Sequence, residues 1–302
     1  MSVTFAQGFS AAGVAAGISA VEGKKDLALV VNNGPLDAAA GVFTSNRFCA
    51  APVQWSRNIV SDGHVKAVIL NSGGANACTG KPGYEQSKAT AEKVASLIGA
   101  KAEDVAVCST GLIGELLPLD NVLSGADKAF ETLADTAEAG ADASHAIMTT
   151  DTKNKEVAVQ VELCGVQVTI GGMCKGSGMI HPNMCTMLSF VTTDAVITKE
   201  LLQEALSTDI QDTYNMISVD GDTSTNDTVL LLANGMAENP EITEKNADYE
   251  AFLEALHYVN ETLAKYMAGD GEGATALFEV KVTGAASKAD AVRLSKSIVT
   301  SS

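Results

Sequence analysis

The chain has 302 residues, 46% of them hydrophobic, which is enough apolar material for one large domain or two modest ones with a packed core. Its 37 acidic residues outnumber its 20 basic residues and give a net charge of −17, which argues against binding to nucleic acid or to anionic membranes. No apolar run approaches the roughly 18 to 20 residues of a membrane span, and the N-terminal segment lacks the basic region of a signal peptide. The six cysteines show no CxxC spacing, so we expect a cytoplasmic protein with reduced thiols.

Hydrophobic periodicity divides the chain into strands and helices, with no low-complexity linker and no internal repeat. The segment up to about Gly23 is rich in small residues and is expected to form a loop or a surface strand. The turn signal Asn33-Gly34-Pro35 is expected to join a strand at 26–32 to a strand at 38–43. In chain order the pattern predicts strands at 26–32, 38–43 and 65–70, a helix at 84–98, a strand at 105–108, a helical region at 119–139, a hairpin of 156–163 with 166–170, a strand at 187–192, a helix at 198–206, a strand at 229–232, a helix at 248–267, a strand at 277–283 and a helix after Ser287.

Segment 71–81 superficially resembles a phosphate-binding P-loop, because it follows a strand and contains Gly80-Lys81. The spacing does not fit that motif, since five residues instead of four separate Gly74 from Gly80. Pro82 also stands where a P-loop needs a Ser or Thr to hold magnesium. We therefore expect no nucleotide site in this segment.

Two further patterns suggest a metal site and fail on inspection. Segment 220–222 (DGD) resembles the start of a calcium loop, but Thr225 stands where the sharp turn requires glycine. His181 and Cys185 are four residues apart, yet Pro182 breaks the helix that would align them on one face. The sequence therefore predicts no metal ligands.

Segment 171–194 contains four glycines, one lysine and a Cys-Thr pair directly before a predicted strand. Such a glycine-rich loop brings backbone close to reacting atoms, and we take Thr186 as the candidate nucleophile. No Ser-His-Asp order and no G-x-S-x-G elbow supplies a side-chain base. If the peptide bond before Thr186 is cut, the new α-amine, with a pKa of about 7.7–8.0, can accept the hydroxyl proton. The residues alone leave open the alternative that Thr186 is a structural residue at a strand start.

Segment 175–188 (KGSGMIHPNMCTML) resembles the self-cleavage segment of the glutamate N-acetyltransferase / ornithine acetyltransferase (ArgJ) family of arginine biosynthesis. The resemblance continues over nearly the whole chain, in the order that the family has. The other blocks that carry it are 71–80, 109–114, 149–152, 219–228 (VDGDTSTNDT) and 270–275 (DGEGAT).

This resemblance implies an α/β fold, namely a layered αββα sandwich of the DmpA/ArgJ-like type. It also implies a precursor that cuts itself between Cys185 and Thr186, giving an α-chain of residues 1–185 and a β-chain of residues 186–302. The two chains would assemble as a heterotetramer of two α and two β chains. The freed Thr186 would take the acetyl group of N-acetylornithine and pass it to glutamate through an acetyl-Thr186 ester.

Two residues are implied as the oxyanion hole of this reaction. The hydroxyl of Thr110 and the N–H of Gly111 would stabilise the negative charge of the tetrahedral intermediate. A glycine suits that position because its backbone N–H can approach the substrate closely. Without the family resemblance, segment 109–111 would be interpreted as an ordinary turn after a strand.

The resemblance also implies a set of substrate-binding residues, which includes Thr186 itself. Glu272 would pair with the amine of the substrate, and Lys175 would meet its α-carboxylate or tune Thr186. A threonine of the 149–152 loop would complete the site, and the sequence leaves open whether Thr150 or Thr152 makes the contact. Without the family, Lys175 would be a solvated loop cation and Glu272 a turn residue.

The chain departs from the family pattern at three points, one of which is Gly74 in place of a commoner Asn. Cys185 stands where the family usually has Ala, and family members continue past the equivalent of Ser302, so we expect a chain that lacks the family's C-terminal part. The competing interpretations are an N-terminal-nucleophile aminopeptidase or amidohydrolase of the DmpA type, and an inactive truncated fragment. The KGSGM and DGEGAT blocks favour acetyl transfer. No cofactor is expected, and the sequence leaves open whether acetyl-CoA serves as a second acetyl donor.

Overall fold

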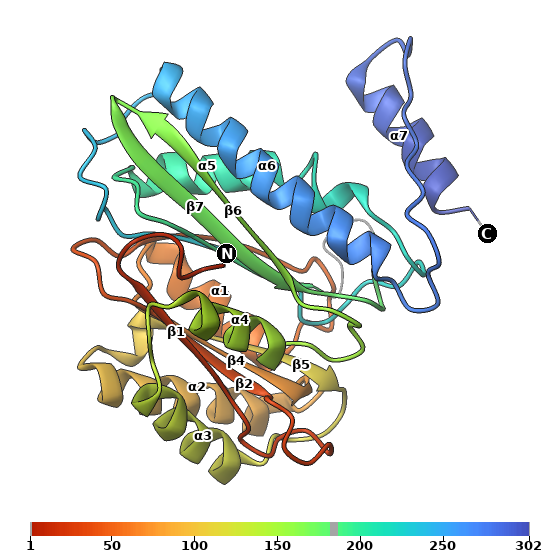
Figure 1. The fold of residues 1–302 in the computed structure, drawn as a ribbon. Coiled ribbons are helices and arrows are strands. Elements are labelled where there is room, and N and C mark those ends of the chain that lie inside the picture. The colour runs from red at the N-terminus through yellow and green to blue at the C-terminus, as the bar shows by residue number, and fades with distance from the viewer. Residues whose placement is uncertain (1, 182–186, 302) are drawn as a thin grey trace.

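The strands form two stacked sheets within residues 2–181 and 187–301, the part of the chain that the computed structural model describes (Figure 1). One sheet has four strands, in the spatial order β1 (Phe9–Val14), β2 (Leu27–Asn32), β4 (Ala67–Gly74) and β5 (Val105–Leu112). β1, β2 and β4 pair antiparallel, whereas β4 and β5 run parallel. Because β4 and β5 are parallel, their last residues, Gly74 and Leu112, lie at the same end of the sheet.

The second sheet has five strands, in the order β3 (Ala38–Phe43), β9 (Thr228–Ala233), β8 (Leu188–Thr193), β7 (Val166–Lys175) and β6 (Lys155–Leu163). β8 and β9 are parallel and the other pairs are antiparallel. In the register of β7 with β8, Lys175 lies opposite Leu188. The last residue of β7 therefore lies beside the first residue of β8.

Helices cover the outer faces of both sheets (Figure 1). The helices packed on the four-stranded sheet are α2 (Gly80–Ile98), α3 (Leu119–Glu131) and α4 (Ala137–Ala146), and those on the five-stranded sheet are α5 (Lys199–Asp209) and α6 (Ala247–Gly269). Short 3₁₀ turns occur at η1 (Val60–Asp62), η2 (Ala102–Asp104) and η3 (Tyr214–Met216). The layers are helix, sheet, sheet, helix, so the predicted αββα sandwich is confirmed.

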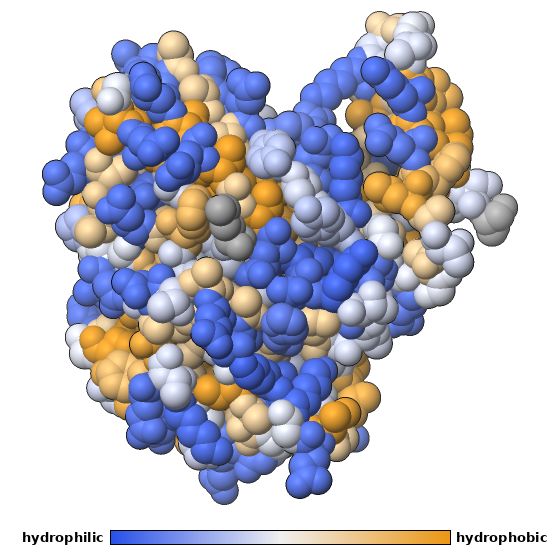
Figure 2. All heavy atoms as spheres, in the orientation of Figure 1, coloured by the Kyte–Doolittle hydropathy of each residue, from blue (hydrophilic) through white to orange (hydrophobic). Residues whose placement is uncertain are grey.

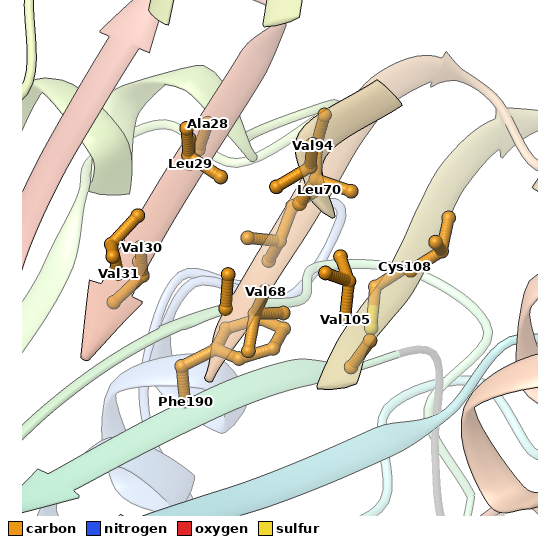
Figure 3. Packing of buried hydrophobic residues seen from close by; sticks show 14 of the residues in the cluster. Ala28, Leu29, Val30, Val31, Val68, Leu70, Val94, Val105, Cys108 and Phe190 are labelled. Carbon is orange, nitrogen blue, oxygen red and sulfur yellow. The ribbon is translucent and has the colours of Figure 1, made fainter. Parts of the chain in front are cut away.

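The core between the sheets is built from alternating residues of the strands. Phe190 and Leu230 of the five-stranded sheet belong to the same buried cluster as Val68 of the four-stranded sheet (Figure 3). Their chain neighbours Val191 and Leu231 belong instead to the cluster beneath α5 and α6. Because successive side chains of a strand point to opposite faces, a fully apolar strand can serve both layers at once.

Helix α1 (Ala51–Ile59) covers the outer edge of β5, which would otherwise expose unpaired backbone groups. The hydroxyl of Ser56 donates to the carbonyl of Val107 at 2.7 Å and accepts from the Val107 N–H at 2.9 Å. The indole N–H of Trp55 donates to the carbonyl of Val105 at 3.0 Å. Side chains of α1 thus replace the missing neighbouring strand, a role that the sequence pattern did not reveal.

The turn between the predicted strands at 26–32 and 38–43 connects the two sheets. The two strands exist as β2 and β3, but they lie in different sheets. The turn between them docks on the end of β9, where the N–H of Leu36 donates to the carbonyl of Asn234 at 3.0 Å. The segment up to Gly23, expected to form a loop or a surface strand, contains β1, a partly buried strand at one edge of the four-stranded sheet.

The predicted helical region at 119–139 is two helices, α3 and α4. The chain leaves the helix because Ala134 pairs with Ala11 of β1, with N–H···O distances of 2.9 and 3.1 Å in the two directions. Thr136 then begins α4, and its hydroxyl accepts from the Ala139 N–H at 3.2 Å. A contact between segments far apart in sequence therefore outweighed the helical periodicity.

The segment after α6 lies apart from the two sheets. Residues 277–283, predicted as a strand, join neither sheet, and helix α7 (Lys288–Val299) stands away from the main body (Figure 1). Apolar side chains are exposed on this segment, among them Phe278 (70% exposed) and Leu294 (54%), and Figure 2 shows the apolar surface gathered there. No helix among the described residues has the length and hydrophobicity needed to cross a membrane.

Candidate active site

Lys175 occupies the centre of the candidate site, at the end of β7. Its side chain is only 2% exposed, and its Nζ lies 2.8 Å from the hydroxyl of Thr149 and 3.4 Å from the hydroxyl of Thr110. The Oδ2 of Asp151 lies 3.9 Å away. Three segments that the sequence singled out, the ends of β5 and β7 and the 149–152 loop, therefore meet at one ammonium group.

Backbone packing at the end of β5 explains why Gly111 follows Thr110. Gly111 has a φ of +132°, and a Cβ atom there would lie 2.3 Å from the carbonyl carbon of Gly73 on β4. Only glycine fits this position, both for conformation and for space. Thr110 is 4% exposed whereas Gly111 is exposed, so the hydroxyl is enclosed beside Lys175 while the following peptide faces outward.

The three threonines of the 149–152 loop have different surroundings. The hydroxyl of Thr149, which the sequence did not single out, is the one that Lys175 contacts. Thr152 is held through its N–H at 3.0 Å and through its hydroxyl by the carboxylate of Asp270. Thr150 is exposed. A substrate contact by Thr150 or Thr152 stays a prediction.

Glu272 lies on an exposed loop beside the glycine-rich segment that follows Lys175. Its N–H donates to the carbonyl of Ser177 at 2.8 Å. A Cβ atom built on Gly178 would lie 2.8 Å from the Oε1 of Glu272, so the carboxylate packs against that glycine. The KGSG and DGEG segments, almost a hundred residues apart in the chain, are thus neighbours in the fold.

The electrostatics of the site arise from charges that are removed from water. Burial lowers the pKa of Lys175, and the nearby carboxylate of Asp151 offsets this effect only in part. Burial acts in the opposite sense on Asp151, but the positive charges of Lys175 and Lys155 outweigh it and lower its pKa. Lys175 is therefore an ammonium group with little hydration, poised to bind an anionic group or to lose its proton.

The predicted cleavage site, Cys185 and Thr186, lies outside the described residues. The description resumes at Met187, whose N–H donates to the Oδ1 of Asp227 at 3.1 Å. Asp227 is fully buried, and its Oδ2 has no hydrogen-bond partner among the described residues. Burial raises the pKa of Asp227 well above 3.8, despite the Met187 hydrogen bond. Sequence reasoning missed this carboxyl group, although it lies within the VDGDTSTNDT block.

Asn226 is a second residue of that block that the sequence reasoning missed. Its side-chain NH₂ donates to the carbonyls of Ala75, at 2.7 Å, and Ser109, at 2.8 Å. These carbonyls lie beyond the end of β4 and within β5, directly before Thr110. Asn226 therefore links the loop before β9 to the end of β4 and to β5 beside Thr110.

A pocket of about 500 Å³ opens next to the Lys175 cluster. It is lined by Lys24, Lys25, Asp142, His145, Met148, Thr149 and Asp151. Thr149 and Asp151, two of these lining residues, also contact the Lys175 ammonium. Within the described part of the chain, no group of three or more His, Cys, Asp or Glu side chains could hold a metal ion.

Fold and site together define an α/β sandwich in which a buried lysine and a threonine hydroxyl converge at strand ends between the two sheets. Comparison with known proteins assigns the family. The chain belongs to the ArgJ family, whose sequence model matches residues 10–302.

Curated relatives support this assignment over the full length of the chain. It is 64% identical, over 302 residues, to "Arginine biosynthesis bifunctional protein ArgJ" of Bifidobacterium longum, covering 100% of this chain and 75% of that protein. It is 51% identical over 295 residues to the protein of the same name from Caldanaerobacter subterraneus, covering 98% of this chain and 72% of that one. The chain thus spans about three quarters of the length of these relatives.

Solved structures agree with the family and separate it from the alternative. An ornithine acetyltransferase of Mycobacterium tuberculosis, solved in complex with ornithine, is 47% identical with a TM-score of 0.56, covering 62% of this chain and 96% of its own. An aminopeptidase of Ochrobactrum anthropi, described as a variant of the Ntn-hydrolase fold, has a TM-score of 0.51 but only 12% identity, covering 86% and 85%. The latter likeness shows a common fold alone, so the aminopeptidase interpretation is not favoured.

Proposed function

We propose that this protein is an acetyltransferase of arginine biosynthesis, which moves the acetyl group of N-acetylornithine to glutamate through an ester on Thr186. The observation that carries the proposal is the convergence of Lys175 and Thr110, 3.4 Å apart, at the strand pair where Lys175 lies opposite Leu188. Thr186, the proposed nucleophile, precedes Leu188 by two residues in the sequence. The family and the names of its relatives support the same reaction.

The nucleophile is made by cleavage between Cys185 and Thr186, which gives an α-chain of residues 1–185 and a β-chain of residues 186–302. The hydroxyl of Thr186 attacks the carbonyl carbon of Cys185, and water then hydrolyses the resulting ester to leave a free α-amine on Thr186. The solved Mycobacterium chain supports this step by its size. It matches 62% of this 302-residue chain while being itself 96% covered, which is close to the proportion that the α-chain occupies.

Acetyl transfer follows in two half-reactions. The Thr186 hydroxyl gives its proton to the α-amine and attacks the acetyl carbonyl of N-acetylornithine. The hydroxyl of Thr110 and the N–H of Gly111 donate to the oxyanion of the tetrahedral intermediate. As that intermediate collapses, the carbon–nitrogen bond breaks and ornithine leaves with the proton from the α-ammonium. The amine of glutamate then attacks the acetyl-Thr186 ester by the same route in reverse.

Charged groups around the nucleophile bind the two amino-acid substrates. Lys175, stripped of water by burial, meets the α-carboxylate that both substrates share. Glu272, exposed beside Gly178, pairs with the side-chain ammonium of the ornithine part. Thr150 or Thr152 completes the site from the neighbouring loop.

Three further properties belong to the same proposal. The relatives are named bifunctional, and we infer that acetyl-CoA can also acetylate Thr186, without any cofactor bound permanently. The α- and β-chains assemble as a heterotetramer of two of each. The enzyme acts in the cytoplasm.

Self-cleavage provides the decisive experiment, because it precedes all other steps. Purified protein should give two fragments by mass spectrometry, with the new N-terminus at Thr186, and should exchange acetyl groups between N-acetylornithine and glutamate. Thr186→Ala should remain one chain, whereas Thr186→Ser, which keeps a hydroxyl, should still be cut. Cleavage of Thr186→Ala at the same bond would refute the nucleophile, and cleaved, folded wild-type protein without exchange would refute the reaction.

A further inference from the structure

Lys155, at the start of β6, is a fully buried lysine that the proposed reaction does not use. Its Nζ lies 2.7 Å from the Oδ1 of Asp151 and 2.6 Å from the Oδ2 of Asp270. The side chains of Lys155 and Asp151 are 0% exposed and that of Asp270 is 4% exposed. A buried cation is costly unless it is paired and hydrogen-bonded, so such an arrangement calls for a reason.

Asp151 connects Lys155 to the segment that carries Lys175. The Oδ1 of Asp151 also accepts from the N–H of Gly176, the residue after Lys175, at 2.7 Å. Its Oδ2 accepts from the N–H of Thr149 at 3.1 Å and faces the Lys175 ammonium at 3.9 Å. The carboxylate of Asp151 thus binds the backbone N–H that follows Lys175 and also faces the Lys175 ammonium.

Asp270 connects Lys155 to the segment that carries Glu272. Its carbonyl accepts from the hydroxyl of Ser177 at 2.7 Å, and the carbonyl of Ser177 accepts from the N–H of Glu272 at 2.8 Å. The loop of Glu272 is therefore linked to the loop of Lys175 in two ways. Hydrogen bonds with Ser177 link them directly, and the ion pairs of Lys155 with Asp270 and Asp151 link them indirectly. The four buried charges of Lys155, Lys175, Asp151 and Asp270 balance to zero.

The position of these residues in the chain adds a second consequence. Lys155 and Asp151 precede residue 186 and Asp270 follows it, so the Lys155–Asp270 ion pair joins the two proposed fragments. Another buried aspartate, Asp209, offers a contrast within one fragment. Its carboxylate bonds His257 at 2.7 Å and Asn260 at 2.6 Å, all three residues lying after 186 and on helices α5 and α6.

We propose that Lys155 and Asp270 are positioning residues, whose ion pair across the cleaved bond holds the substrate-binding groups Lys175 and Glu272 at a fixed separation. This inference rests on the proposed function for the identity of the two fragments and of the ligand. The pair is assigned no substrate contact in the proposed reaction. It acts through Asp151 on Lys175 and through the 270–272 backbone on Glu272.

Asp270→Asn tests the proposal, because it keeps the size of the side chain and removes the charge that Lys155 meets. The full-length, cleaved protein should bind ornithine at least about 10-fold more weakly, as measured by calorimetry. Its two fragments should also separate at a lower guanidinium concentration than those of the wild type. Ser177→Ala removes only the hydroxyl that donates to the Asp270 carbonyl. It should also weaken ornithine binding, by a smaller factor than Asp270→Asn.

Asp209→Asn is the matched control, because it neutralises a buried aspartate whose bonds stay within one fragment. It should leave unchanged both the ornithine affinity and the guanidinium concentration at which the fragments separate. Wild-type ornithine affinity in both Asp270→Asn and Ser177→Ala would overturn the positioning role. Binding is measured separately from acetyl exchange, so a wild-type protein that binds ornithine and fails to exchange acetyl groups would count against the proposed function alone.

Discussion

The Nζ of Lys175 lies 3.4 Å from the hydroxyl oxygen of Thr110, although the two residues are 65 positions apart in the chain. Lys175 ends a strand of the five-stranded sheet, and Thr110 lies near the end of a strand of the four-stranded sheet. The candidate site is therefore formed where strand ends from both sheets meet. Substitutions of these two residues test the proposed chemistry most directly.

Lys175→Met should reduce kcat/KM for acetyl exchange by about 10- to 100-fold, the value of a hydrogen bond to a charged group. The variant should fold at least as well as the wild type, because burial already lowers the pKa of Lys175 and Asp151 keeps its bond to Lys155. Steady-state kinetics and thermal unfolding check both expectations. Lys88→Met, at an exposed position on α2, should change neither, and equal kinetics for the two variants would exclude Lys175 from the site.

Thr110→Val should lower kcat for exchange by about 10²–10³, because it removes one donor to the oxyanion while keeping the shape of the side chain. Thr110→Ser keeps the hydroxyl and should retain most of the activity. The comparison of kcat with KM is informative, since an interaction made mainly in the transition state affects kcat. A Thr110→Val enzyme that loses only substrate affinity would assign Thr110 to binding instead.

Gly111→Ala should disrupt the end of β5, because the added Cβ would lie 2.3 Å from the carbonyl carbon of Gly73. Gly114→Ala is the control, since Gly114 also has a positive φ, of +96°, but nothing lies within 4 Å of its Cβ position. The control should lose about 1–3 kcal/mol of unfolding free energy from backbone strain alone. Gly111→Ala should lose more, together with its exchange activity; equal losses in urea unfolding would disprove the steric argument.

Asp227→Asn should remove a pH-dependent loss of stability. Burial raises the pKa of Asp227 in the folded state, whereas in the unfolded chain this carboxyl group ionises near pH 3.8. The free energy of unfolding therefore falls as the pH rises above 3.8, and it stops falling once the pH passes the folded-state pKa. Asn keeps an oxygen for the Met187 N–H and does not ionise. Urea unfolding should therefore give similar stability for both proteins below pH 3.8 and a more stable variant at pH 7. Parallel stability curves across this range would contradict the assignment.

Asn226→Leu should destabilise the protein by about 2–4 kcal/mol, because two buried carbonyls lose their donor. It should also lower kcat for exchange, since one of these carbonyls belongs to Ser109, directly before Thr110. Asn239→Leu is the control, as the buried NH₂ of Asn239 likewise donates to two carbonyls, those of Val196 and Pro240. It should cost similar stability and leave the kcat of the folded enzyme unchanged; a normal kcat in Asn226→Leu would separate Asn226 from the site.

Sequence by itself determined the elements whose pattern is local. Helix α6 was predicted at 248–267 and extends over 247–269, and the hairpin of β6 and β7 turns at the predicted Cys164-Gly165. Spacing of apolar residues at 3.6 or 2 is a property of neighbouring residues, so it can be read without a fold. The segments that carry Thr110, Lys175 and Glu272 were likewise recognisable as short blocks of letters.

Tertiary structure alone decided which of these elements and side chains meet. β2 and β3 follow each other in the chain, but the turn between them docks on Asn234 and carries the chain to the other sheet. The acceptor of the Met187 N–H, Asp227, is 40 residues away, and the ion pair of Lys155 with Asp270 spans 115 residues. Burial and pairing of charges depend on such distant neighbours, and no local pattern encodes them. The blocks around the site were therefore predictable, while the buried charges that hold them together were not.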